Sequence, residues 1–158
     1  MTGGDSDSPR RRRSARHAAM DLLARREHSR AELRDKLAAR DYEADEIDAA
    51  LDRLTGEGLA NDGRFVTAYV ASRIRRGYGA IRIRAELVER RVAAELIASA
   101  LAEIDDWAAR ARDVRERRFG PAAPADFAER AKQSRFLEYR GFTAGEIRAA
   151  FKNPTDEN

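Results

Sequence analysis

The sequence repeats itself with a period of 50 residues, and Leu37, Leu87 and Leu137 share one register of this repeat. Five further columns show the same shift without a gap: Arg40, Arg90 and Arg140; Tyr42, Val92 and Phe142; Ile47, Ile97 and Ile147; Ala50, Ala100 and Ala150; Leu51, Leu101 and Phe151. Such a period is typical of one supersecondary unit copied in tandem, because each copy is too small to bury its apolar face well alone. We therefore predict an elongated, curved array of three modules.

Each copy has the apolar periodicity of amphipathic helices, and no segment alternates as a strand would. Capping patterns mark three helix starts, at Ser29, Asp126 and Thr143. A helix over about 44–54 is expected to stop at Gly56 and Gly58, because glycine tolerates the left-handed backbone of helix ends. The predicted fold is all-α, with about nine helices in three three-helix repeats at residues 14–57, 58–104 and 105–153.

The two ends of the chain lack this periodicity. Residues 1–13 end in the run from Arg10 to Arg13, so we predict a disordered basic arm. Residues 154–158 form a short acidic tail. The arm either adds non-specific affinity for anionic polymers or serves only as a flexible solubility tail.

Composition excludes several classes of protein. The chain is 42% hydrophobic and 37% charged, which argues against global disorder. It has no cysteine, hence no disulfide framework and no thiolate metal site. No apolar run reaches the roughly 20 residues that span a bilayer, and no signal peptide is evident. We expect a cytoplasmic protein with no membrane partner.

Charge is unevenly distributed along the chain. Residues 64–91 hold eight arginines and two glutamates, a local charge of +6, whereas residues 41–62 hold eight acids and one arginine, a local charge of −7. Of the 31 basic residues only Lys36, Lys132 and Lys152 are lysine, and a GC-rich genome explains that preference as well as phosphate recognition does. The clustering of the arginines remains informative.

Catalytic and metal-binding patterns are weak. His17 and His28 are the only histidines, and no nucleophile or orienting group accompanies them. Acidic residues near Asp45 lack the spacing of an EF-hand loop, and Gly77–Gly79 resembles a dinucleotide loop but follows no strand. We expect neither an enzyme nor a bound metal or cofactor.

The candidate binding site is an arginine-rich corner of the second repeat. Its residues are Arg73, Arg75, Arg76, Tyr78, Arg82 and Arg84. Guanidinium groups bind phosphate or carboxylate with two parallel hydrogen bonds, and tyrosine can stack on a base. Structural roles are also open, since Arg75 and Arg76 could compensate a helix C-terminus and Arg82 could pair with Glu86.

A second basic cluster lies in the third repeat and includes Arg110, Arg115 and Arg118. Neighbouring acids dilute it, so a solvated helix face explains it equally well. Compensation of helix C-termini explains the repeated arginines at positions 40, 90 and 140. Gln133 departs from the apolar column of Leu33 and Ile83, which leaves the packing of the third repeat open.

Three motifs within the tandem units carry a family resemblance. They are Ser29-Arg30-Ala31-Glu32-Leu33 with Leu37, the stretch from Gly58 to Phe65, and Gly77-Tyr78-Gly79 leading into Ile83 and Glu86-Leu87. The sequence resembles the bacterial RecX regulatory proteins over about residues 15–152, most closely in the first two units. The resemblance implies a cytoplasmic, non-enzymatic modulator that binds in the groove of the RecA filament on DNA and restrains RecA ATPase and strand exchange in recombination and the SOS response.

We accordingly expect an interaction protein that binds the RecA filament, with contacts to single- or double-stranded DNA through the filament or weakly alone. A linear repeat needs no partner to complete its core, so we expect a monomer. The alternative is a general nucleic-acid-binding helical repeat protein that does not depend on RecA, since three-helix units can place a helix in a groove.

Overall fold

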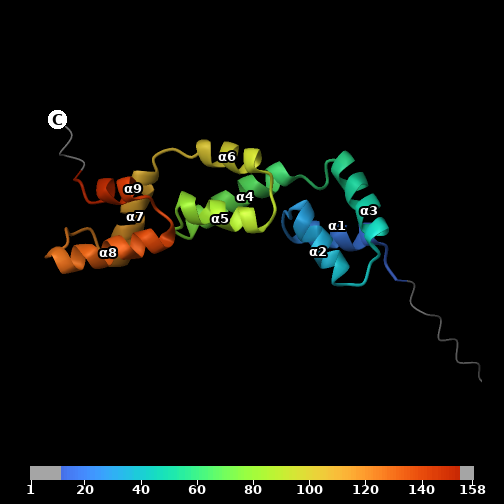
Figure 1. Ribbon diagram of the computed structural model, residues 1–158, viewed down its shortest axis with the longest axis horizontal. Helices are drawn as coiled ribbons and strands as arrows, with labels where there is room; N and C mark the ends of the chain where they lie inside the picture. Colours follow the sequence, from blue (N-terminus) through green and yellow to red (C-terminus); the bar gives the residue numbers. More distant parts are fainter. Residues whose placement is uncertain (1–11, 154–158) are drawn as a thin grey trace, which may run out of the picture. The chain divides into compact units, whose positions relative to one another are not determined.

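The computed structural model describes residues 12–153, and these residues form nine α-helices and no β-strand (Figure 1). The helices are α1 (Ala15–Arg25), α2 (Arg30–Ala38), α3 (Ala44–Gly56), α4 (Asp62–Arg75), α5 (Ala80–Glu89), α6 (Ala94–Ala102), α7 (Trp107–Phe119), α8 (Phe127–Arg140) and α9 (Ala144–Ala150). The all-α fold and the division into three-helix repeats are confirmed.

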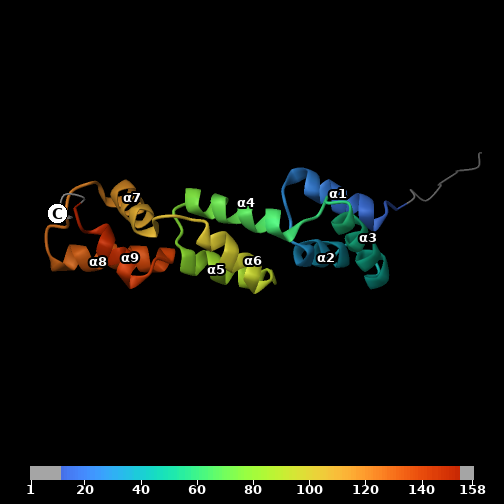
Figure 2. The ribbon, with the colours of Figure 1, turned by 90° about the horizontal axis from the view of Figure 1, so that it is seen from above.

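The chain divides into two compact units, residues 1–61 and residues 62–158. In the first unit, α1, α2 and α3 pack around an apolar core (Figure 2). Leu33, Leu37, Leu51 and Leu54 are completely buried in this core. Because every one of these residues lies on the predicted apolar stripe of its helix, periodicity alone identified the interior of this repeat.

The second unit contains the second and third repeats, each with its own core. Phe65, Ile83 and Leu87 lie at the centre of the second repeat, and Leu137 lies at the centre of the third. Trp107 is half-buried and packs against both clusters.

The predicted helix caps are present, with small shifts in helix bounds. Ser29 and Thr143 each complete a capping box, and the Asp126 side chain accepts a hydrogen bond from the amide of Glu129. The helix α3 ends at Gly56, which confirms the stop expected there. The left-handed residue that follows the helix is Gly58, with φ of 73°.

Backbone hydrogen bonds join the second and third repeats. The amide of Gly79 donates to the Arg140 carbonyl over 2.8 Å, and the amide of Ile81 donates to the Gly141 carbonyl over 3.0 Å. A Cβ on Gly79 would lie 2.5 Å from the Gly141 carbonyl group, and a Cβ on Gly141 would lie 2.5 Å from the Cβ of Arg82. Only glycine permits this approach of two backbones.

Most of the predicted basic arm and the acidic tail lie outside the described residues. The last two arm residues are described, and both contact the first unit. Arg13 pairs with Asp21 over 2.7 Å and its carbonyl accepts a hydrogen bond from the hydroxyl of Tyr42. Arg12 places its guanidinium 4.2 Å from the centre of the Tyr42 ring.

Candidate anion-binding site

The arginine-rich corner of the second repeat divides into two groups with different environments. Arg73 and Arg82 belong to the first group, and both bind Glu86 on α5. Arg73 Nη2 lies 2.6 Å from Glu86 Oε1, and Arg82 Nε lies 3.2 Å from the same oxygen. The second carboxylate oxygen accepts a hydrogen bond from the Tyr69 hydroxyl over 2.6 Å. Both arginines are therefore held by one carboxylate, which offsets one of their two positive charges.

Tyr78 lies between the same two guanidinium groups. The ring centre is 4.0 Å from the Arg73 Cζ and 4.2 Å from the Arg82 Cζ, while Arg140 of the third repeat is 5.0 Å away. Cations at these distances from an aromatic ring are attracted to its electron-rich face. Tyr78 is half-buried and contacts all three guanidinium groups.

The pKa values of this cluster follow from its burial and hydrogen bonding. Burial raises the pKa of Tyr69 to about 12, and its hydrogen bond to Glu86 acts in the same direction. Burial also opposes ionisation of Glu86, but hydrogen bonds from Tyr69, Arg73 and Arg82 outweigh it and lower the carboxyl pKa. Glu86 therefore stays ionised and keeps both arginines in place.

Arg75 and Arg76 form the second group, and the third repeat completes their surroundings. They line a hollow of about 220 Å³ together with Gly77 of the same turn. The other lining residues come from α7 and α8: Val114, Arg117, Arg118, Phe136 and Arg140. This basic hollow contains five arginines and no acidic residue.

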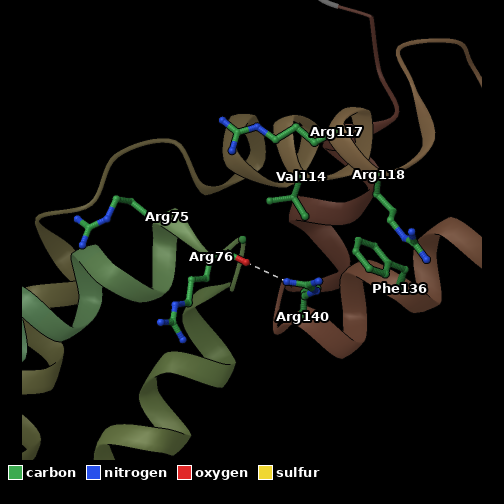
Figure 3. A pocket seen from close by; sticks show the side chains of 8 residues that line it. Arg75, Arg76, Val114, Arg117, Arg118, Phe136 and Arg140 are labelled. Carbon is green, nitrogen blue, oxygen red and sulfur yellow. Dashed lines mark hydrogen bonds between the residues drawn. The ribbon is translucent and has the colours of Figure 1, made fainter.

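Phe136 and a backbone carbonyl orient the inner arginines of the basic hollow (Figure 3). Arg140 Nη1 donates a hydrogen bond to the Arg76 carbonyl over 2.9 Å. The guanidinium carbons of Arg140 and Arg118 lie 5.0 Å and 5.9 Å from the centre of the Phe136 ring. Gly77, with φ of 84°, forms part of the wall, and a Cβ there would lie 3.3 Å from a methyl of Val114.

The remaining candidates lie outside the basic hollow. Arg84 is exposed on α5, and Arg110 is half-buried with its Nε bonded to the Asp105 carbonyl. Arg115 departs most from expectation, because the structure buries it to 5% exposure. Its Nη1 lies 3.4 Å from both the Ala122 carbonyl and Oε1 of Gln133. A guanidinium held in the interior is not available to an external anion.

Sequence reasoning missed Arg140 and Phe136 as members of this site. Arg140 was interpreted as compensation of a helix end, but its guanidinium reaches across to the second repeat. The sequence did contain one signal for this contact, the glycine at position 141, where the first two repeats have Asp41 and Arg91. The equivalent residues Asp41 and Arg91 adopt positive φ without glycine, at 63° and 56°. Gly141 has a larger φ of 98°, and a Cβ there would also lie 2.5 Å from the Cβ of Arg82, so glycine at this position marks the junction that forms the basic hollow.

Among residues 12–153, no three His, Asp or Glu side chains lie together in a way that would hold a metal ion. No helix in this part of the chain combines the length and the apolar character needed to cross a membrane.

Comparisons with known proteins give a consistent result. Three family models match in order: the RecX first three-helix domain at residues 15–54, the second at 61–101 and the third at 105–151. The chain is 49% identical over 138 residues to the regulatory protein RecX of Halorhodospira halophila, covering 87% of this chain and 86% of that protein. It is 50% identical over 131 residues to the RecX protein of Pseudomonas fluorescens, covering 82% and 84% of the two chains.

Solved structures show the same fold. The crystal structure of RecX from Lactobacillus salivarius aligns with a TM-score of 0.73 at 20% identity, over 86% of this chain and 91% of that one. A second RecX crystal structure aligns with a TM-score of 0.72 over 85% of this chain. With all three domain models matched in order and relatives near 50% identity along most of its length, the chain belongs to the RecX family of regulatory proteins.

Proposed function

We propose that this protein binds the RecA filament on DNA and inhibits its ATPase and strand-exchange activities, as a modulator of recombination and the DNA-damage response. The observation that carries the proposal is the presence of all three RecX domains, in order, over residues 15–151. The proposal assigns the protein no chemistry of its own and places it in the cytoplasm, where RecA acts, as a monomer.

The basic hollow supports this proposal because a filament on DNA presents anions to its binding partners. Arg75, Arg76 and Arg118 are exposed, and the structure gives their guanidinium groups no ion pair with a described residue. Electrostatic attraction of such groups to phosphate or carboxylate would speed and orient docking. Arg73 and Arg82 contribute less to this attraction, since both are bound to Glu86, which offsets one of their two charges.

The direct test adds the purified protein to RecA filaments assembled on single-stranded DNA. We expect ATP hydrolysis and strand exchange to fall together as the protein concentration rises. Unchanged rates of both reactions at saturating protein would contradict the proposal.

The rival function is RecA-independent binding to nucleic acid. It predicts equal affinity for bare DNA and for filaments at matched salt, whereas filament recognition predicts tighter binding to the filament. A sedimentation assay with filaments and bare single-stranded DNA in parallel separates the two.

A further inference from the structure

The basic hollow has the charge pattern of a site for a polyanion. Five arginines line it without one carboxylate. Within residues 12–153, Arg117 alone of the five has an ion pair, with Asp113 outside the hollow over 2.8 Å. A single carboxylate from a protein would neutralise one of these charges. A chain with a negative charge at every unit could neutralise several at once, and release of its counterions would add to the affinity.

The positions of the guanidinium groups favour a polymer over a small enclosed ligand. Figure 3 shows Arg75, Arg76 and Arg117 extending outward from around the hollow, whereas Arg118 and Arg140 lie beside Phe136. Cations spread in this way can contact successive phosphates of a strand that passes over the opening. The volume of about 220 Å³ offers room for one backbone group to enter.

The aromatic surface within the basic hollow is already occupied. Phe136 meets Phe119 edge to face at 5.3 Å between ring centres, and Arg118 and Arg140 lie against the same ring. A base therefore has no free face on which to stack, and the groups that remain are charged donors that contact backbone phosphate.

We infer that the basic hollow between the second and third repeats binds the phosphodiester backbone of single-stranded nucleic acid without preference for base sequence. A single strand can bend a phosphate into a concave site, whereas duplex phosphates lie on a rod with a persistence length of about 50 nm. This inference deepens the proposed function and rests on it, because it assigns the DNA contact of the filament-bound protein to this junction.

The test compares two doubly substituted proteins of equal net charge. R75Q/R118Q removes one exposed arginine from each side of the hollow. K132Q/R135Q removes two exposed cations from α8 outside the hollow. None of the four side chains makes a hydrogen bond or ion pair that holds the fold, so circular dichroism should match the parent protein for both variants.

Fluorescence anisotropy with labelled dT and dA oligomers then measures affinity over a salt series. For R75Q/R118Q we expect affinity to fall on the order of tenfold at low salt, and the slope of log affinity against log salt to fall by roughly 1.4, about 0.7 for each lost phosphate contact. For K132Q/R135Q we expect a change of less than about twofold. Oligomers of dT and dA should bind alike.

Three outcomes would overturn the inference. They are equal losses of affinity in the two variants, stronger binding to duplex than to single strands, and competition by polyglutamate as effective as that by DNA, which would assign the hollow to an acidic protein.

Filament inhibition by the unsubstituted protein is measured separately. If inhibition stands while the hollow variants bind DNA normally, only the inference fails; if inhibition is absent, the proposed function fails whatever the hollow binds.

Discussion

The first and third repeats place different chemistry at the same positions of one template. Ala15 and Leu33 are completely buried in the first repeat, and the 50-residue period carries these positions to Arg115 and Gln133. The third repeat buries both polar side chains to 5% and 3% exposure and bonds them to each other over 3.4 Å. The difference shows that an apolar pair can be exchanged for a polar pair when both members change together.

The polar pair leaves one buried nitrogen atom of the third repeat without a hydrogen bond. Gln133 Nε2 also donates to Glu129 over 3.2 Å, but Nε of Arg115 is buried without a hydrogen-bond partner among the described residues. Phe151 lies 5.3 Å from the Arg115 guanidinium and supplies part of its environment. A buried polar group without a hydrogen-bond partner costs about 1–3 kcal/mol, which sets the scale of the loss at Arg115.

The largest loss of stability is expected when glutamine is placed in the core of the first repeat without the arginine that accompanies it in the third. L33Q should lower the free energy of unfolding of the first unit by about 3–5 kcal/mol, because it removes apolar contacts and buries an amide without its partner. Hydrogen exchange by mass spectrometry can resolve this loss at α1–α3. Retention of full protection there would show that the first repeat tolerates polarity as the third does.

A second comparison uses position 41 of the first repeat and position 141 of the third. G141A should lower the free energy of unfolding of the second unit by about 2–3 kcal/mol, because the new Cβ would lie 2.5 Å from the Cβ of Arg82 and 2.6 Å from its backbone nitrogen. Position 41, with φ of 63°, already holds a residue with a Cβ. D41A should therefore lower the free energy of unfolding of the first unit by only about 1 kcal/mol. Urea unfolding of both variants checks the difference, and equal losses would remove the close approach as its cause.

A double-mutant cycle tests whether the two polar residues act as a pair. R115M and Q133L should each destabilise the second unit, because each leaves the other side chain buried with one partner fewer. The double variant should be more stable than the sum of the two losses predicts, by about 1 kcal/mol or more. Trp107 is the only tryptophan and lies in this unit, so its fluorescence during urea unfolding reports the cycle. Strict additivity would mean that the bond between them contributes nothing.

The smallest expected effect is a pH dependence in the first repeat. Burial lowers the pKa of His28, and Lys36 Nζ, 3.0 Å from Nε2, can only donate to it. The Nδ1 nitrogen, 3.0 Å from the Arg26 carbonyl, then carries the proton. The nearby carboxylate of Glu32 favours protonation but does not reverse the shift.

The sign of the effect follows from the lowered pKa. The unfolded chain takes up a proton below about pH 6.5, before the folded chain does, so stability is complete above that pH and falls as the pH drops further. Hydrogen exchange of α1–α3 at several pH values should show the decline in the parent protein and a weaker decline in H28N. Equal declines would assign the effect to other groups.

The sequence was sufficient for features that depend on neighbours along the chain. Periodicity identified the nine helices, and local motifs identified the capping residues Ser29 and Thr143, because a cap bonds an amide three residues away. Arg75, Arg76 and Arg118 were also found as candidates, since clustered charge is visible in sequence.

The missing part of the site depends on contacts between repeats. Arg140 lies 64 residues from Arg76, to whose carbonyl it is bonded, and nothing in local spacing predicts that contact. The burial of Arg115 could not be predicted from the sequence for a related reason. An arginine at a core position is indistinguishable in sequence from one on a solvated face until its partner Gln133 is placed beside it.

The backbone junction at Gly79 has a consequence for the order in which the protein acquires its structure. Gly79 provides no side-chain cap for α5, and the carbonyls of Arg140 and Gly141 receive the amides at that helix start instead. During synthesis on the ribosome, the middle of the second repeat emerges well before those acceptors exist. The start of α5 is therefore held by water until the third repeat has been made, and a chain truncated before Arg140 would leave the second repeat with a frayed helix.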